Sequence, residues 1–281
     1  METTLFAKTM IILCGQLLIV FGLAFYVLRG AKLAYQNNTK FMGFSFRGAM
    51  NLKRELDLIP YVEPKVAYPR EMFHPGNINN ETPNVYVINE EKRNEFLKKG
   101  YIDCKPSNKF FNALFLPWVI LLFSTVFVGA LSVQIGMIAF TAQSILFGLI
   151  LGMIFLEMDE NDGIRALKIT LLATIFCGFV GYSDIGQALN SSGYVHAFLF
   201  FGLLGLIIFE FSRTTFKFSR NTIRAKAFFG IGLFILFLFV DFARLKELSD
   251  SSNDWSTAFD IALNLYLDII NLLLEILEAM E

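Results

Sequence analysis

The sequence predicts an all-α polytopic membrane protein, a bundle of seven membrane-spanning helices with a small polar insertion of α/β-like character. Of its 281 residues, 55% are hydrophobic and only 17% are charged, whereas soluble domains are about 45–50% apolar and about 25% charged. The apolar residues also form long blocks, and a helix that crosses a bilayer needs roughly 20 of them. The seven blocks are residues 5–28, 110–132, 135–156, 166–182, 195–211, 227–243 and 257–278.

The same composition excludes several classes of protein. The apolar content excludes a disordered chain and an ordinary soluble enzyme. The net charge of −1 gives no electrostatic basis for binding nucleic acid. Three cysteines and two histidines, scattered along the chain, form neither a disulfide framework nor a zinc-site pattern, so no cofactor is expected.

The first block is expected to be a retained span, residues 1–28 of the chain. It is too long and too apolar for a signal peptide, and it lacks a clear small-residue cleavage site. Pro117 lies inside the second block, where bilayer helices tolerate it. Only residues 132–134 separate the second block from the third, which predicts a tight hairpin. Glycines in the later blocks are expected to allow close helix packing: Gly129, Gly136, Gly148, Gly152, Gly178 and Gly181.

Residues 29–109 form a polar insertion between the first block and the six-helix remainder, residues 110–281. The insertion holds 14 of the 24 Lys and Arg residues. Its residues 84–88 alternate as a strand does, and residues 89–99 are charged and helix-forming, with Gly100 as the expected cap. These patterns predict a partly folded insertion.

Cations in the short loops predict the orientation, because cytoplasmic loops carry an excess of Lys and Arg. With seven spans, seven such cations lie on the side of the C-terminus and three lie on the side of the N-terminus. This predicts an outside N-terminus and an inside C-terminus, and the expected location is a cell inner or plasma membrane. The two sets are Arg165, Lys168, Arg213, Lys217, Arg220, Arg224 and Lys226 against Lys8, Arg244 and Lys246.

The last block carries a polar stripe along one face of the expected helix. At about 100° per residue its five polar side chains fall within a narrow arc, which therefore faces the bundle interior or water. Asp268 is the most informative, because apolar residues flank it on both sides and a charge at membrane depth is costly. Asp260 and Glu275 lie near the helix ends and are secondary candidates. The stripe is Asp260, Asn264, Asp268, Asn271 and Glu275.

Asp241 ends the apolar run of the preceding block and is expected to meet Asp268, because consecutive spans are antiparallel. Two carboxylates in a low-dielectric site cannot both ionise cheaply, so the pair would share a proton and act as a pH-dependent latch. With Asn264 and Asn271 they also form an oxygen-only set suited to transient binding of Ca²⁺. In the alternative interpretation the asparagines only hydrogen-bond neighbouring helices.

Other polar residues are weaker candidates. The acidic run from Glu157 to Asp162 is expected to be a solvated loop, and His196 an interfacial residue. Gln143 and Ser144 could line a cavity or simply contact neighbouring helices. The basic loop around Arg213–Arg224 is expected to contact lipid headgroups.

Two segments resemble one known family. The stretch from Ala262 to Leu272, with its Tyr-Leu-Asp-x-x-Asn pattern, resembles the signature of the last helix in the transmembrane Bax inhibitor motif family. Val240–Lys246 is similar to the family's other acidic signature. The sequence departs from the family pattern in two loops, 132–134 and 183–194, which lack the usual basic residues. The charge count above also gives the orientation opposite to the one usual in the family.

The resemblance implies seven spans and a calcium-permeable, pH-sensitive leak pathway with Asp241 and Asp268 as the paired-aspartate sensor. Animal relatives are implicated in restraining cell death, and some bacterial ones bind a membrane protease. An alternative function is therefore a non-transporting regulator that binds a membrane protease or another partner through residues 29–109. The sequence shows neither a Gly-x-Ser-x-Gly nor a His-Glu-x-x-His motif, so an enzyme is not expected.

Overall fold

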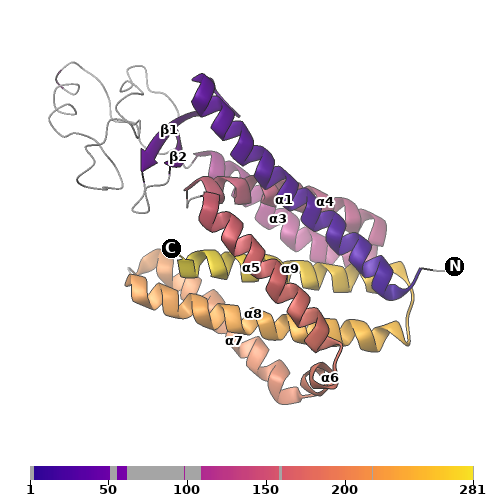
Figure 1. Cartoon of the computed structure of the whole chain (residues 1–281). Coiled ribbons are helices and arrows are strands. Elements are labelled where there is room, and N and C mark those ends of the chain that lie inside the picture. Colours follow the sequence, from indigo (N-terminus) through magenta and orange to yellow (C-terminus); the bar gives the residue numbers. More distant parts are fainter. Residues whose placement is uncertain are drawn as a thin grey trace. The chain divides into compact units, whose positions relative to one another are not determined.

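The computed structural model describes residues 3–50, 56–61, 98, 109–157, 160–216 and 218–280. Helices dominate this part of the chain (Figure 1), which confirms the all-α class. The helices of the described residues are α1 (Leu5–Asn37), α3 (Lys109–Leu131), α4 (Val133–Glu157), α5 (Glu160–Gly181), α6 (Asp184–Asn190), α7 (Gly193–Thr215), α8 (Arg220–Ser249) and α9 (Trp255–Met280).

A long helix coincides with each of the seven apolar blocks. Within the described residues, five of these helices are long and apolar enough to cross a membrane: α1, α4, α5, α7 and α8. In α3 the apolar segment is shorter, Ala113–Thr125, and α9 carries acidic residues along its length. The structure thus supports a multi-pass membrane protein. That α3 and α9 also cross the membrane, which would make seven spans, stays a prediction.

Two helices differ from the sequence-based expectation. The helix α1 continues nine residues beyond the apolar block, to Asn37, and ends where Asn38 adopts a positive φ of 53°, a conformation in which asparagine often terminates helices. Residues 183–194, expected to be a loop, contain the short helix α6. Its first-turn Asp184 favours a helix start at this point.

The insertion contains a β-hairpin that the sequence did not predict. Strand β1 (Ser45–Met50) pairs antiparallel with β2 (Leu56–Tyr61), with Phe46 opposite Pro60 and Gly48 opposite Leu58. The predicted strand at 84–88 lies outside the described residues, as does the predicted helix at 89–99 except for Lys98, which is helical. The α/β-like character of the whole insertion therefore stays a prediction.

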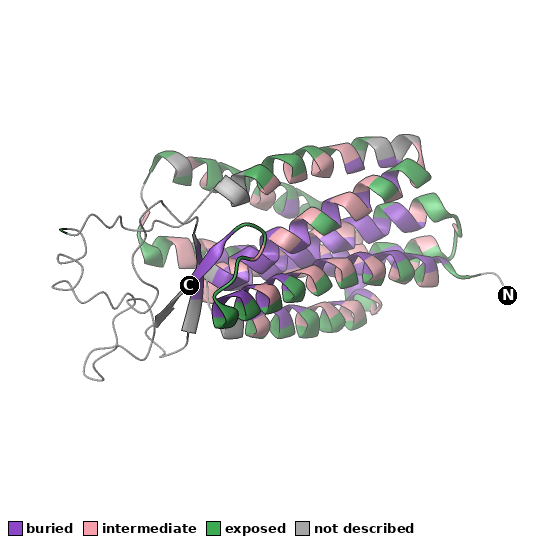
Figure 2. Cartoon of the chain, turned by 90° about the horizontal axis from the view of Figure 1, so that it is seen from above, coloured by how far each residue is buried: buried purple, intermediate pink, exposed green. Residues whose placement is uncertain are grey.

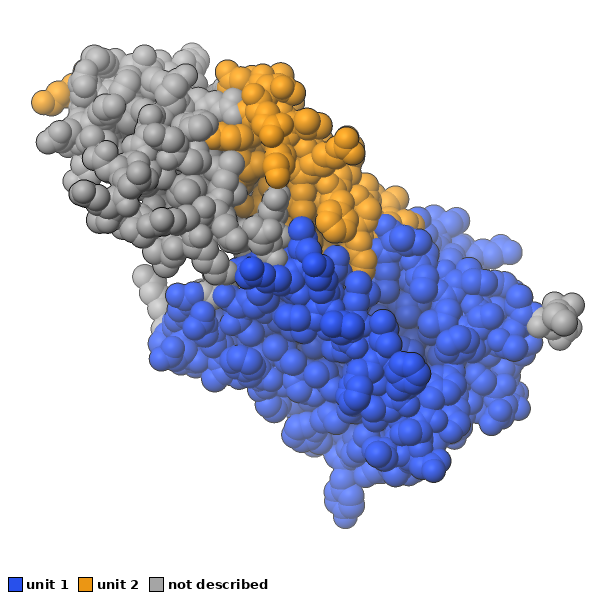
Figure 3. Space-filling view, in the orientation of Figure 1, with its two compact units in different colours: residues 1–18, 122–141, 162–281 blue, residues 19–121, 142–161 orange. Residues whose placement is uncertain are grey.

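The chain divides into two compact units (Figure 3). One unit comprises residues 1–18, 122–141 and 162–281, and the other comprises residues 19–121 and 142–161. In the second unit a Cβ at Gly148 would lie 2.7 Å from the Val20 carbonyl oxygen, so α1 and α4 pack at close range. In the first unit a Cβ at Gly136 would lie 2.7 Å from the Gly129 Cα atom, which fits the predicted tight hairpin. These contacts confirm the expected packing role of the glycines.

The helices differ in how far they are buried: one lies in the interior, and others have exposed apolar faces (Figure 2). Most of α9 is buried, including Phe259, Tyr266 and Ile269. By contrast α5 and α7 expose large apolar side chains, such as Phe179 at 76% and Phe211 at 72% of their surface. An apolar outer surface of this extent is typical of a protein that lies in lipid.

Candidate functional site

The helices α8 and α9 form an antiparallel pair within the first unit, joined by residues 250–254. The turn is held by Asp254, which caps α9: its Oδ1 accepts a 2.9 Å hydrogen bond from the Thr257 backbone N–H. Hydrogen bonds from the Ser252 and Thr257 hydroxyls also reach this carboxylate. The bond from Ser252, followed by those from Thr257, lowers the pKa of Asp254. The Lys8 ammonium donates to the Asn253 carbonyl at 2.6 Å.

The structure brings Asp241 of α8 and Asp268 of α9 together, as the sequence predicts. The two carboxyl groups lie within hydrogen-bonding distance of each other. Asp268 is buried, with 9% of its surface exposed, and Asp241 is half-buried. The guanidinium of Arg244, one turn along α8, exerts a favourable electrostatic effect on Asp241.

Asp268 faces α8 and α5. Cys177 of α5 is fully buried and close enough for the Asp268 carboxyl to act on it electrostatically. Its thiol donates to the Ile235 carbonyl of α8 at 3.8 Å. On the opposite side of α9, Tyr266 contacts Phe140 of α4 edge to face, with ring centroids 4.8 Å apart. The aspartate pair thus lies among α5, α8 and α9.

The other residues of the stripe differ in burial and in surroundings. Asn264 and Asn271 are half-buried on α9, one turn to either side of Asp268, whereas Asp260 is exposed. Glu275 is buried but belongs to a different cluster. Among the described residues, the side chains of His, Cys, Asp and Glu form no group of three or more that could hold a metal ion.

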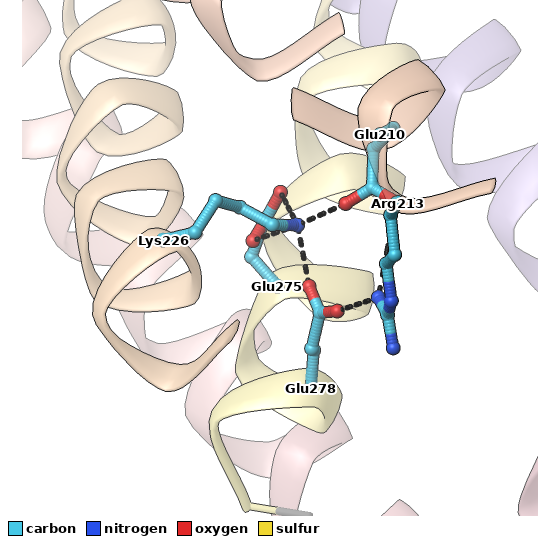
Figure 4. Close-up of polar contacts among 5 residues, drawn as sticks. All are labelled: Glu210, Arg213, Lys226, Glu275 and Glu278. Carbon is cyan, nitrogen blue, oxygen red and sulfur yellow. Dashed lines mark hydrogen bonds and ion pairs between the residues drawn. The ribbon is translucent and has the colours of Figure 1, made fainter. Parts of the chain in front are cut away.

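That second cluster is an ion network at the C-terminal end of α9 (Figure 4). The ammonium of Lys226, at the start of α8, lies 2.5 Å from Glu210 of α7 and 3.3 Å from Glu275, and it also pairs with Glu278. Arg213 of α7 pairs with Glu278 and lies 3.8 Å from Glu210. Only 7% of the Lys226 side chain is exposed, so the network joins α7, α8 and α9 around a buried cation.

Sequence reasoning missed this network. The sequence pattern places Lys226 and Arg213 among the loop cations and does not single out Glu210. One signal was available: Glu275 and Glu278 are three residues apart, on one face of a helix, and Lys226 stands directly before an apolar block. What the sequence does not contain is the position of α7 beside that end of α9.

The weaker candidates lie in different surroundings. Asp162 does not lie in a solvated loop as expected, because it is buried in α5 and forms a 3.4 Å ion pair with Arg165. His196 Nε2 lies 2.8 Å from the Asn190 carbonyl oxygen. Gln143 and Ser144 are fully buried in α4, and their side-chain polar atoms have no hydrogen-bond partner among the described residues. Asp159 of the acidic run lies outside the described residues.

No curated protein matches the chain. A family model described as "Inhibitor of apoptosis-promoting Bax1" matches residues 96–281. The match covers well over half of the chain and includes α3 to α9 with both aspartates. The chain is therefore a multi-pass membrane protein that belongs to the Bax inhibitor family.

Proposed function

We propose that the chain provides a pH-sensitive cation leak across its membrane, with Ca²⁺ as the first ion to test, and that the Asp241–Asp268 pair is its latch. The contact between these two carboxyl groups carries the proposal. It joins the last two helices at a buried point, and its strength depends on how many protons the pair holds.

The chemistry of the latch follows from the short distance between the carboxyls. With one proton, a carboxylic acid donates to the neighbouring carboxylate and the hydrogen bond holds α8 against α9. With no proton, two buried negative charges repel each other or attract a cation. With two protons, the charge-assisted bond is replaced by a weaker neutral one. The packing of α8 on α9 therefore depends on pH.

A permeating cation would meet oxygen ligands on α9. Asp268 supplies a carboxylate, and Asn264 and Asn271 supply amide oxygens one turn away on either side, which are ligands that Ca²⁺ accepts. A pair of carboxyls with two half-buried amides is a sparse set for a resident Ca²⁺ ion. It suits an ion that binds briefly and leaves, as conduction requires.

The test is Ca²⁺ influx into dye-loaded proteoliposomes between pH 5 and 8. We compare the wild-type chain with Asp241→Asn and Asp268→Asn, and use Asp250→Asn, an exposed aspartate at the end of α8, as the matched control. We expect a pH-dependent flux in the wild type and the control, and a flux that is lost or insensitive to pH in the two variants. Equal pH profiles in all four proteins would refute the latch.

A second function is favoured by the β1–β2 hairpin, which gives the insertion a folded part. In this proposal the chain does not transport ions but regulates a membrane protease or another membrane protein, which it binds through residues 29–109. Because α1 continues to Asn37, the deletion to test is residues 40–105. Retained flux with a lost cellular phenotype would favour this proposal over the leak. Neither proposal involves catalysis.

We also propose that the chain lies in a cell inner or plasma membrane with its N-terminus outside and its C-terminus inside. The support is the excess of Lys and Arg in the short loops on the C-terminal side. A reporter fused to the C-terminus that is active only in the cytoplasm tests this orientation. A signal only from a reporter that is active outside would reverse it.

A further inference from the structure

A pocket lined by three arginines lies at one end of the α7, α8 and α9 group, beside the ion network. Its volume is about 440 Å³, and its lining is Arg213, Phe218, Arg220, Ile223, Arg224 and Glu278. Arg213 is near the end of α7, Arg220 and Arg224 are in the first turns of α8, and Glu278 is in the last turn of α9. Helix ends of this kind lie where a membrane protein meets the lipid headgroups.

The charges of the lining do not cancel. Arg213 pairs with Glu278, the one carboxylate in the lining. Arg220 and Arg224 have no carboxylate partner in the part of the chain that the structure describes. The Nε of Arg224 is moreover buried and lacks a hydrogen-bond partner among the described residues. Two guanidinium groups therefore remain available to an anion.

The start of α8 adds to the positive potential. Ser219 caps this helix and its hydroxyl accepts one hydrogen bond, 3.2 Å from the Thr222 N–H. The N-terminus of a helix carries partial positive charge and favours anions. Because Arg220 and Arg224 belong to the same first turns, the helix end and the two guanidiniums act at one place.

The remaining walls of the pocket are apolar. Ile223 and Phe218 line it, and Phe218 is held by stacking on Phe209 of α7, with ring centroids 4.7 Å apart. A guanidinium binds phosphate oxygens through two parallel hydrogen bonds. Arginines beside apolar side chains at a helix end thus fit the headgroup of an amphiphile better than a fully hydrated ion.

We propose that this pocket binds a phosphate group, presented by an anionic membrane lipid, through Arg220 and Arg224. A phosphate monoester carries a charge of about −1.5 to −2 at pH 7, which matches the two unpaired guanidiniums. A zwitterionic headgroup has no net charge and would bind weakly. Glu278 also lines the pocket, but it pairs with Arg213 and Lys226 (Figure 4), so its charge is compensated.

The experiment is titration calorimetry on the full chain in a non-ionic detergent. The probes are dioctanoyl phosphatidic acid, inorganic phosphate and dioctanoyl phosphatidylcholine. The variants are Arg220→Gln and Arg224→Gln, with Lys168→Gln, an exposed cation of α5 outside the pocket, as the matched control. The variants change partly exposed side chains at a helix start, and their fold is verified by circular dichroism.

We expect phosphatidic acid to bind and phosphatidylcholine not to bind. Loss of one guanidinium should weaken binding by roughly tenfold or more, and the control should leave it unchanged. If phosphatidic acid binds and inorganic phosphate does not, the result supports a lipid as the source of the phosphate group. If both bind equally, the result supports the phosphate site but indicates a soluble ligand. Absence of binding by both phosphate probes, or equal weakening in all three variants, overturns the proposal.

Discussion

The helices α8 and α9 are joined by two polar contacts of opposite electrostatic design. At the middle of α9, carboxyl meets carboxyl, because Asp241 and Asp268 lie within hydrogen-bonding distance. Near its C-terminal end, Glu275 and Glu278 meet the buried ammonium of Lys226. The first contact changes with the number of protons it holds, whereas the second is a compensated ion network. The ion network thus needs both of its charges to be stable, whereas the energy of the carboxyl contact depends on protonation.

Removing Lys226 tests the ion network and should cause the largest loss in the free energy of unfolding. Lys226→Met leaves Glu275, which is 9% exposed, without its countercharge. Removing one partner of a buried ion pair typically costs about 3–5 kcal/mol. We therefore expect a loss of that size in the free energy of unfolding, measured by denaturant titration in detergent micelles.

Two further variants separate charge from packing at this end. Glu210→Gln removes a partner whose side chain is 48% exposed, and exposed pairs contribute only about 0.2–1 kcal/mol. The double variant Lys226→Met with Glu275→Gln removes the stranded charge and should recover much of the loss. If Glu210→Gln were as damaging as Lys226→Met, the network would not be centred on a buried pair.

The turn between the two helices contains Asp254, an exposed carboxylate that accepts several hydrogen bonds. Removing it should have an effect on stability of intermediate size. Asp254→Ala removes the cap of α9 and should cost about 1 kcal/mol at neutral pH. Since the pKa of Asp254 is lowered in the folded protein, its stabilisation is complete above the unfolded pKa of about 4 and is lost as the pH falls below it.

The measurement is thermal unfolding of the wild type and Asp254→Ala at several pH values between 3 and 7. The difference between the two proteins should shrink below about pH 4. Asp250→Ala, which changes an exposed carboxylate at the same turn, is the control. A difference that does not vary with pH would mean that Asp254 acts through its packing and not through its charge.

The two contacts also differ in how far the sequence could predict them. Asp241 and Asp268 lie in consecutive apolar blocks, and helical periodicity puts Asp268 on a polar face, so their meeting needs no knowledge of the remaining fold. The ion network requires α7 to lie beside the ends of both α8 and α9, and the pattern within a single helix does not contain that information. The family signature lies in the predictable part, at Asp268 and Asn271.

In the described part of the insertion, the sequence does not predict the β1–β2 hairpin, and the reason is a different one. Strands β1 and β2 include Gly48 and Pro60, which strands usually avoid, so neither segment has the regular alternation that indicates a strand. The helix α1 was predicted from hydropathy, which locates its apolar part. Its continuation to Asn37 depends on local helix-forming residues and on Asn38 as a terminator.

Removing one aspartate tests the contact between Asp241 and Asp268 and should have the smallest effect on stability. In Asp268→Asn the amide can donate to Asp241 as a protonated carboxyl does, and the repulsion between two charges disappears. We expect the free energy of unfolding at neutral pH to change by less than about 1 kcal/mol, far less than in Lys226→Met. Asp268→Leu, which strands Asp241 without a donor, should cost more. If Asp268→Asn were as destabilising as Lys226→Met, the aspartate pair would be a structural bond like the ion network, and a latch at this point would lose its physical basis.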